Sequence, residues 1–329
     1  MTYFSYEPIL FFRVAEVVPK CYKDCFSRMK INQRIKAVSL PSWAKINLFF
    51  AILGKRDDDY HDLLSIISKI DLSDLITIER TGPDGFLECE CAHLSDLPAE
   101  RNLAVKAVIA WREKTGLDFG VRIHILKRIP VQAGLGGGSS NAVSVIIALN
   151  RMLSEPFSKD FLIDLATSLG SDCPSFVDER TCIVSGRGER VRFLNQEKSQ
   201  SLKNREIFLF MPPLGFSTEE IYKGLSDYED CFSSKTESQD LVDKWESGGI
   251  SETEVLFNGF EPSIFKKHLY LSPLFEDLSQ KYGLMPKVSG SGSCCFCLAN
   301  SHSTWENFKS SVQSAWGENA FTYRGRILC

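Results

Sequence analysis

The amino-acid sequence predicts an α+β fold, in which strands and helices mix without alternating regularly. Residues 121–126 alternate between apolar and polar side chains, the period of a strand with one buried face. After a glycine-rich segment, apolar residues recur at helical spacing from Ala142 to Leu149. No internal repeat is visible, and the lack of strict strand–helix alternation argues against a doubly wound parallel sheet.

The first half of the chain is predicted to hold several short strands. A charged loop at residues 55–59 separates one of them from an apolar stretch that ends at Ile70. Helical spacing of apolar residues predicts a helix through Trp111, closed by Gly116. The expected strands cover residues 38–40, 44–53 and 75–78.

The second half is predicted to begin with a helix over residues 161–169, after which Pro174 prevents further helix. A strand at 207–211 opens a second region, and the polar residues 224–250 are expected to form an exposed insertion. Near the end, Ser303 and Glu306 have the spacing of a capping box for the last helix.

Composition and charge exclude some classes of protein. The 329 residues are 43% hydrophobic, enough for a sizeable core, and no run is long enough to span a membrane. Seven of the 38 basic residues but only three of the 42 acidic ones fall within residues 1–36. The rest of the chain is therefore net acidic, so we expect neither nucleic acid nor a membrane as a partner.

Cysteine usage predicts a reducing compartment. The count of eleven is odd, and the spacing suggests no disulfide framework. Cys294, Cys295 and Cys297 lie in an apolar run without a second ligand pair, so we interpret them as small buried hydrophobic residues, and no metal is assigned to protein side chains. We expect a cytoplasmic protein, or one of the plastid stroma if its source carries plastids.

Residues 1–35 differ from the rest and are left unassigned. They are basic and aromatic, with an apolar patch at residues 9–12 but no small-residue cleavage site. A transit peptide, an extension and a translation start at Met29 remain open.

The segment from Pro130 to Asn141 predicts an anion site. Four glycines in five positions let the backbone approach a ligand, and a helix with Ser139 or Ser140 as its cap follows. The lysine of a P-loop is absent, and Ser139 stands where a dinucleotide fingerprint needs glycine. A plain glycine-rich turn is the alternative, but the two serines and the helix pattern favour phosphate binding.

Three blocks together resemble the motifs of the GHMP kinases: residues 44–48, 130–140 and 289–293. The resemblance covers about residues 38–325 and implies two lobes, one like ribosomal protein S5 and one ferredoxin-like. We expect an ATP-binding domain at residues 36–195 and a C-terminal domain at 196–329. Tyr60-His61 and residues 44–48 resemble the members that phosphorylate 4-diphosphocytidyl-2-C-methyl-D-erythritol.

The resemblance implies a magnesium-dependent phosphotransferase, with ATP as the phosphoryl donor. Asp172 matches the family's catalytic base and Lys45 its cationic partner. Alone, Asp172 would be interpreted as a loop cap and Lys45 as a strand residue reaching solvent. The positions that match ATP-binding ones are Pro130, Val131, Gln132, Ala133, Gly134, Leu135, Gly136, Gly137, Gly138, Ser139, Ser140, Asn102 and Lys127.

The same resemblance implies a cytidine diphosphate substrate whose 2-hydroxyl is phosphorylated, in the non-mevalonate route to isopentenyl diphosphate. His61 would bind the cytosine edge, with Tyr60 and Tyr222 as stacking faces. The substrate-binding matches are Asn47, Tyr60, His61, Thr218, Tyr222, Gly290, Ser291 and Gly292. Another small-molecule kinase of the class and a non-catalytic nucleotide-binding protein are the alternatives, and a monomer or weak homodimer is expected.

Two positions depart from the family pattern. Asp59 replaces the glycine before Tyr60, and Asp tolerates the left-handed backbone better than most residues. Trp43 replaces the proline before Ala44 and adds bulk beside Lys45.

Overall fold

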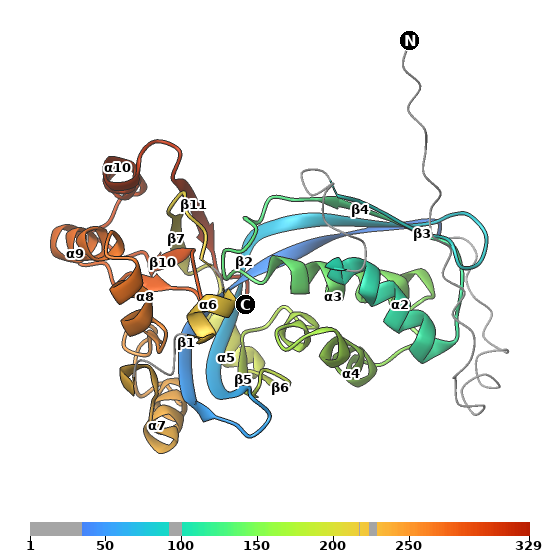
Figure 1. The fold of residues 1–329 in the computed structure, drawn as a ribbon, viewed down its shortest axis with the longest axis horizontal. Helices are drawn as coiled ribbons and strands as arrows, with labels where there is room; N and C mark the ends of the chain where they lie inside the picture. Colours follow the sequence, from blue (N-terminus) through green and yellow to red (C-terminus); the bar gives the residue numbers. More distant parts are fainter. Residues whose placement is uncertain (1–34, 92–100, 217, 224–228) are drawn as a thin grey trace, which may run out of the picture.

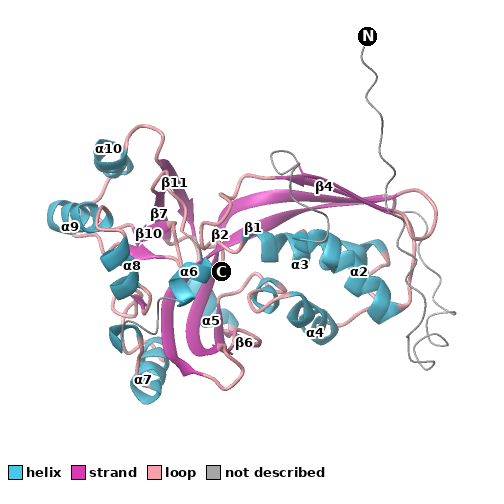
Figure 2. Ribbon diagram, in the orientation of Figure 1, coloured by secondary structure: helices cyan, strands magenta, loops and turns pink. Residues whose placement is uncertain are grey.

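The computed structural model describes residues 35–91, 101–216, 218–223 and 229–329, and residues 1–34 of the unassigned N-terminal segment lie outside this part. It has an α+β fold with two sheets, as the sequence predicts (Figures 1 and 2). No helix in the described ranges combines the length and apolar character that crossing a bilayer requires.

The larger sheet has seven strands, in the order β3-β4-β2-β1-β8, with β5 pairing β2 and β6 pairing β5. The two longest strands replace the short ones that the sequence predicts. Register shifts, such as the one between Trp43 and Ala44, let β1 bend without ending. The strands are β1 (Ala37–Lys55), β2 (His61–Arg80), β3 (Leu87–Cys91), β4 (Val121–Leu126), β5 (Cys182–Gly186), β6 (Arg190–Phe193) and β8 (Phe257–Asn258).

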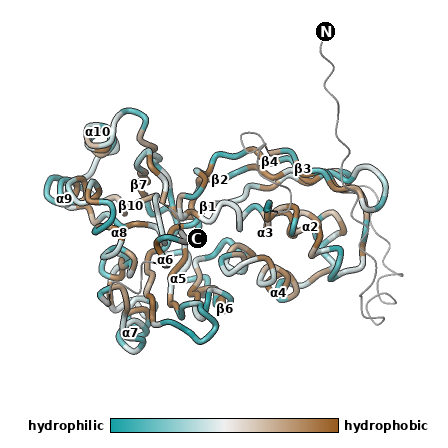
Figure 3. Tube along the Cα trace, viewed as in Figure 1, coloured by the Kyte–Doolittle hydropathy of each residue, from teal (hydrophilic) through white to brown (hydrophobic). Residues whose placement is uncertain are grey.

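Three helices cover one face of this sheet: α2 (Leu103–Thr115), α3 (Gly137–Met152) and α4 (Lys159–Leu169) (Figure 1). Hydrophobic and hydrophilic residues alternate along α2 and α4, as expected for helices with one buried face (Figure 3). In the core between helices and sheet, Trp111 meets Phe157 edge-on with ring centroids 5.0 Å apart.

The smaller sheet has the order β11-β7-β10-β9 and carries helices of the second half on its flank (Figure 1). Its strands are β7 (Glu206–Met211), β9 (Lys287–Val288), β10 (Cys295–Leu298) and β11 (Phe321–Arg326). The other helices are α5 (Gln196–Leu202), α6 (Thr218–Lys223), α7 (Lys235–Glu246), α8 (Glu261–Lys267), α9 (Leu271–Tyr282) and α10 (Trp305–Trp316), with 3₁₀ turns at Cys173–Phe176 and Glu229–Cys231.

Three sequence-based predictions of local structure are wrong. The polar segment 224–250 contains α7, which buries Val242 and Trp245 completely, because two apolar residues three apart suffice to seat a helix. Thr304 caps α10, since the Ser303 hydroxyl instead bonds to Asn300. Pro174 lies in the first turn of a 3₁₀ helix that begins at Cys173, because its fixed φ suits that position.

The start of α3 also differs from the prediction that Ser139 or Ser140 caps it. The N-cap is Gly136, with φ of 68°, and no side chain caps the helix. The Ser140 hydroxyl accepts a hydrogen bond from Ser42 at 2.8 Å. The first turn of α3 therefore keeps its backbone N–H groups free of a side-chain cap.

The interpretation of the late cysteines as small buried hydrophobic residues is confirmed. Cys294, Cys295 and Cys297 are fully buried, and burial raises the pKa of the Cys294 thiol to about 12. Every cysteine in the described ranges is a free thiol.

Candidate active site

The three sequence blocks that resemble GHMP kinase motifs meet in space. The backbone N–H of Lys45 on β1 donates to the carbonyl of Leu135 in the glycine loop at 3.0 Å. From the loop before β10, the Ser289 hydroxyl donates to the Gly134 carbonyl at 3.2 Å. A Cβ at Gly134 would lie 2.1 Å from the carbonyl oxygen of Ser289, so the main chains of the two loops lie too close for a side chain at Gly134.

A cavity of about 420 Å³ opens where these segments converge. Every residue that matches an ATP-binding position lines it except Ser140, which is buried behind the loop. Lys45 and Asp172 also line the cavity, together with Tyr222, Gly290 and Ser291. The fold therefore brings the glycine loop and the acid–amine pair to one place.

The Lys45 amine is buried, with only 4% of the residue exposed, so the interpretation of Lys45 as a strand residue reaching solvent is wrong. Its Nζ donates to Asn47 Oδ1, and Asn47 in turn donates to Ser65 at 2.8 Å. Burial lowers the pKa of Lys45, while the nearby Asp172 carboxylate opposes that shift. A Cβ at Gly290 would lie 3.3 Å from the amine, which places it against the second loop.

The glycine loop and the start of α3 offer main-chain donors to an anion. Gly134 and Gly136 have φ of 72° and 68°, values that L-residues with side chains avoid. A Cβ at Gly136 would lie 2.7 Å from the Phe176 ring and 3.1 Å from Lys45 Cγ. Free N–H groups at the positive end of a helix, beside a lysine, are suited to binding phosphate.

An aromatic cluster lies at one end of the cavity. The Tyr222 ring lies 5.7 Å from His61 and 4.9 Å from Phe260 between centroids, and His61 lies 6.1 Å from Phe232. Burial, with the Lys55 charge, lowers the pKa of His61, so the imidazole is neutral at pH 7. Tyr222 lines the cavity, whereas His61 contacts the Tyr222 ring without lining it.

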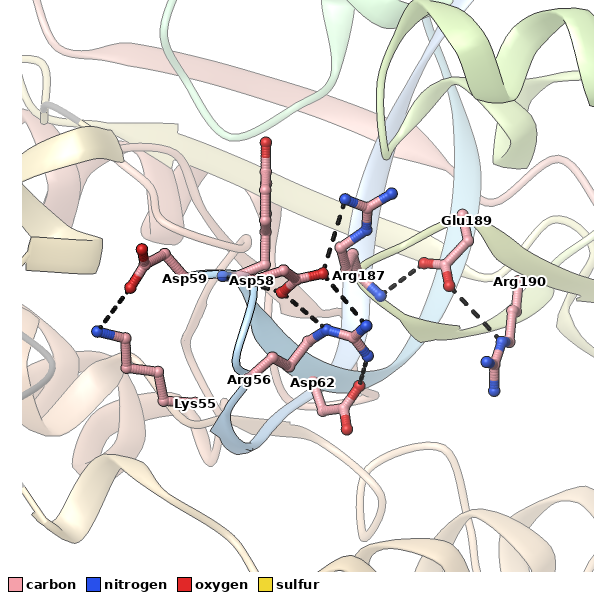
Figure 4. A network of polar contacts seen from close by, with 9 residues as sticks. Lys55, Arg56, Asp58, Asp59, Asp62, Arg187, Glu189 and Arg190 are labelled. Atoms are coloured by element: carbon pink, nitrogen blue, oxygen red, sulfur yellow. Dashed lines mark hydrogen bonds and ion pairs between the residues drawn. The ribbon is translucent and has the colours of Figure 1, made fainter.

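Tyr60 lies in the turn between β1 and β2 and is 54% exposed. The Arg187 guanidinium sits 4.9 Å from its ring centroid, and the same turn holds the ion pairs of Arg56 with Asp58 and Asp62 (Figure 4). Tyr60 therefore does not line the cavity in this conformation.

The remaining predicted positions have varied surroundings. Thr218 begins α6, and its side chain lies outside the described structure. A Cβ at Gly292 would lie 2.6 Å from the Phe216 ring, so Gly292 shapes the second loop without lining the cavity. Asp59 adopts φ of 63° and keeps the turn that glycine would make, and Trp43 donates to Glu179.

Sequence reasoning missed several cavity residues. Phe50 and Phe260 stack with centroids 5.1 Å apart at its wall, and Arg101 and Asn141 also line it. Asn141 ends the segment that was predicted to bind an anion, but it was not among the positions matched to ATP binding. The other three are brought in by the tertiary fold, and no local pattern marks them.

Comparison with known proteins identifies the family. Residues 102–183 match the model for the GHMP kinases N terminal domain, and residues 245–318 match the model for GHMP kinases C terminal. The 4-diphosphocytidyl-2-C-methyl-D-erythritol kinase of Protochlamydia amoebophila is 36% identical over 83% of this chain and 88% of its own. That of Clostridium beijerinckii is 33% identical, over 79% and 90%. The chain belongs to the 4-diphosphocytidyl-2-C-methyl-D-erythritol kinase family of GHMP kinases.

Solved structures agree with this family. A 4-(cytidine 5'-diphospho)-2C-methyl-D-erythritol kinase superposes with a TM-score of 0.68 at 27% identity, covering 88% of this chain and 99% of that one. Homoserine kinase from Cytophaga hutchinsonii gives 0.70 at 14% identity, covering 90% and 96%. The second likeness shows the two-lobed GHMP kinase fold alone.

Proposed function

We propose that this chain transfers the γ-phosphoryl group of ATP to the 2-hydroxyl of 4-diphosphocytidyl-2-C-methyl-D-erythritol, in the non-mevalonate route to isopentenyl diphosphate. Membership of the kinase family supports ATP as the co-substrate. The observation that carries the proposal is one cavity in which the glycine-rich loop adjoins a buried lysine and an aspartate.

In the proposed reaction, the substrate hydroxyl oxygen forms a bond to the γ-phosphorus while the bond to the bridging oxygen of ADP breaks. The hydroxyl proton passes to the Asp172 carboxylate. The Lys45 amine stabilises negative charge near the reacting oxygen, and Asn47 holds it in place. The main-chain N–H groups of the glycine loop and α3 hold the phosphates.

The family implies Mg²⁺ with ATP, and the donors in the cavity fit that ion. No group of three His, Cys, Asp or Glu side chains in the described ranges is placed to hold a metal. Mg²⁺, however, is usually bound by nucleotide phosphates, waters and one or two protein oxygens. The Ser139 hydroxyl lines the cavity and can supply such an oxygen. When bound, Mg²⁺ neutralises phosphate charge.

Turnover with a panel of alcohols tests the proposal. ADP release is measured with 4-diphosphocytidyl-2-C-methyl-D-erythritol, mevalonate and homoserine at equal concentration. We expect turnover with the cytidine compound alone. Faster turnover with mevalonate or homoserine would assign the chain to another GHMP activity, and ADP release with none of them would contradict a kinase of this specificity.

A further inference from the structure

Asp74 is a buried carboxylate on β2 that has no place in the catalytic scheme above. Its side chain is fully buried, and it does not line the cavity. Oδ1 accepts hydrogen bonds from the backbone N–H groups of Arg128 and Ile129 at 2.7 and 2.9 Å. These two residues directly precede the glycine loop, so the carboxylate fixes the backbone at the start of that loop.

The other oxygen of Asp74 contacts two residues that do line the cavity. Oδ2 pairs with the Lys127 amine and accepts from Asn141 Nδ2 at 2.8 Å. Asn141 lies near the start of α3, and its Nδ2 also donates to Ser42 on β1 at 2.8 Å. One carboxylate thus joins the loop start, the cavity lysine and the helix that follows the loop.

Charge gives this arrangement a consequence for nucleotide binding. A buried carboxylate is costly unless it is paired and hydrogen-bonded, and Asp74 meets both conditions. The Lys127 amine lies against the loop, because a Cβ at Gly137 would lie 3.3 Å from its Nζ. Without Asp74, a lysine that is only 10% exposed would lose its counter-ion and keep only its hydrogen bond to Asn141 Oδ1 at 3.2 Å. Without Lys127, the buried Asp74 carboxylate would lose its cationic partner and keep only its hydrogen bonds from Arg128, Ile129 and Asn141.

We propose that Asp74 is a positioning residue for ATP, which holds Lys127 and the start of the glycine loop in the geometry that binds the nucleotide. The inference rests on the proposed function for the identity of the nucleotide. It concerns the ATP end of the cavity alone. Binding of ATP without any alcohol therefore tests it separately from turnover.

The experiment measures the Kd of ATP by calorimetry for Asp74→Asn, Lys127→Met and the double variant. We expect Asp74→Asn to raise the Kd about tenfold, and the KM of the alcohol to change by less than about twofold. The double variant should bind ATP no more weakly than Lys127→Met, because it leaves no unpaired buried charge. A purely structural role would instead multiply the two single effects.

Asp71→Asn is the matched control. Asp71 lies on the same strand and accepts from the backbone N–H of Arg326 at 2.9 Å and from Tyr323, away from the cavity. We expect its variant to bind ATP like the unaltered protein. An unchanged or lower Kd for Asp74→Asn would overturn the inference, as would a double variant weaker than Lys127→Met by a further tenfold or so.

Three further outcomes each have a defined consequence. Should Asp74→Asn fail to fold, the double variant, which carries neither buried charge, is compared with Lys127→Met by the same criterion. If ATP binding responds as expected but no turnover occurs with the cytidine compound, the proposed function fails and the role of Asp74 stands. Normal turnover with unresponsive ATP binding would instead support the proposed function and remove the role of Asp74.

Discussion

The two ends of the cavity are lined by different kinds of chemical group. At the nucleotide end, main-chain groups of the glycine loop form the wall, and buried polar side chains such as Asp74 hold them from behind. The other end, called the ring end below, is lined by the aromatic rings of Phe50, Tyr222 and Phe260. Tyr60, whose position resembles a base-binding one, lies in a turn outside the cavity and is 54% exposed. The loop at the first end is held by hydrogen bonds to its main chain, whereas the second end is built from side chains.

This difference predicts where substitutions will act. Changes at the nucleotide end should alter stability and ATP affinity together, because the loop is part of the packed interior. Changes at the ring end should alter the KM of the cytidine substrate with little effect on stability. Asp172 and Lys45 lie between these two ends, and their substitution should mainly lower kcat.

The largest effect is expected for Asp172→Asn. The amide keeps the shape of the carboxylate but cannot accept the hydroxyl proton, so kcat should fall about 10³-fold. The Kd of ATP should remain near normal, because the phosphates are held by backbone groups of the other segments. Single-turnover kinetics and calorimetry measure the two quantities. A variant with undiminished kcat would remove Asp172 as the base.

The second-largest effect is expected in the pH dependence of kcat, through the charge of Lys45. If catalysis needs the charged amine, kcat falls as pH rises through the Lys45 pKa. Burial lowers that pKa, so the loss should begin below the pH at which an exposed lysine titrates. Lys45→Met should lower kcat about 10²-fold and abolish this alkaline limb. A limb that persists in the variant would assign it to another group.

Gly134→Ala tests the packed character of the nucleotide end. The new methyl group meets the Ser289 carbonyl at a φ of 72°, so we expect a loss of at least about 2 kcal/mol in the free energy of unfolding, with weaker ATP binding. Gly138→Ala is the matched control, because its Cβ would meet only Leu103, at 3.8 Å, within a helix. Urea denaturation compares the two. Equal stabilities would contradict a packed loop.

The nucleotide end could be predicted from the sequence because it depends on local backbone requirements. The spacing of the glycines from Gly134 to Gly138 is compatible with few backbone conformations. All four glycines line the cavity. The pairing of Lys45 with Asp172 came from family resemblance, since the two residues lie far apart in the chain. Their place in one cavity is a property of the fold.

What the sequence did not reveal depends on long-range contacts. Asp74 has the same local pattern as any acidic residue in a strand, and only the register of β2 with β4 brings it to Lys127. The Thr304 cap differs from the prediction by one residue because Ser303 has a competing partner in Asn300. Helix ends are decided by such competition among neighbouring hydroxyls.

The smallest effects are expected at the ring end, where Tyr222→Leu and Tyr60→Leu can be compared directly. Leucine keeps apolar bulk and removes the stacking face, so Tyr222→Leu should raise the KM of the cytidine substrate about tenfold and leave that of ATP unchanged. Tyr60 lies against Arg187 outside the cavity, so Tyr60→Leu should raise the KM of the cytidine substrate by about threefold or less. Steady-state kinetics with each substrate varied in turn measure both. If Tyr60→Leu costs as much as Tyr222→Leu, the turn between β1 and β2 must close over the base during turnover, and the open arrangement of this end is a resting state of the enzyme.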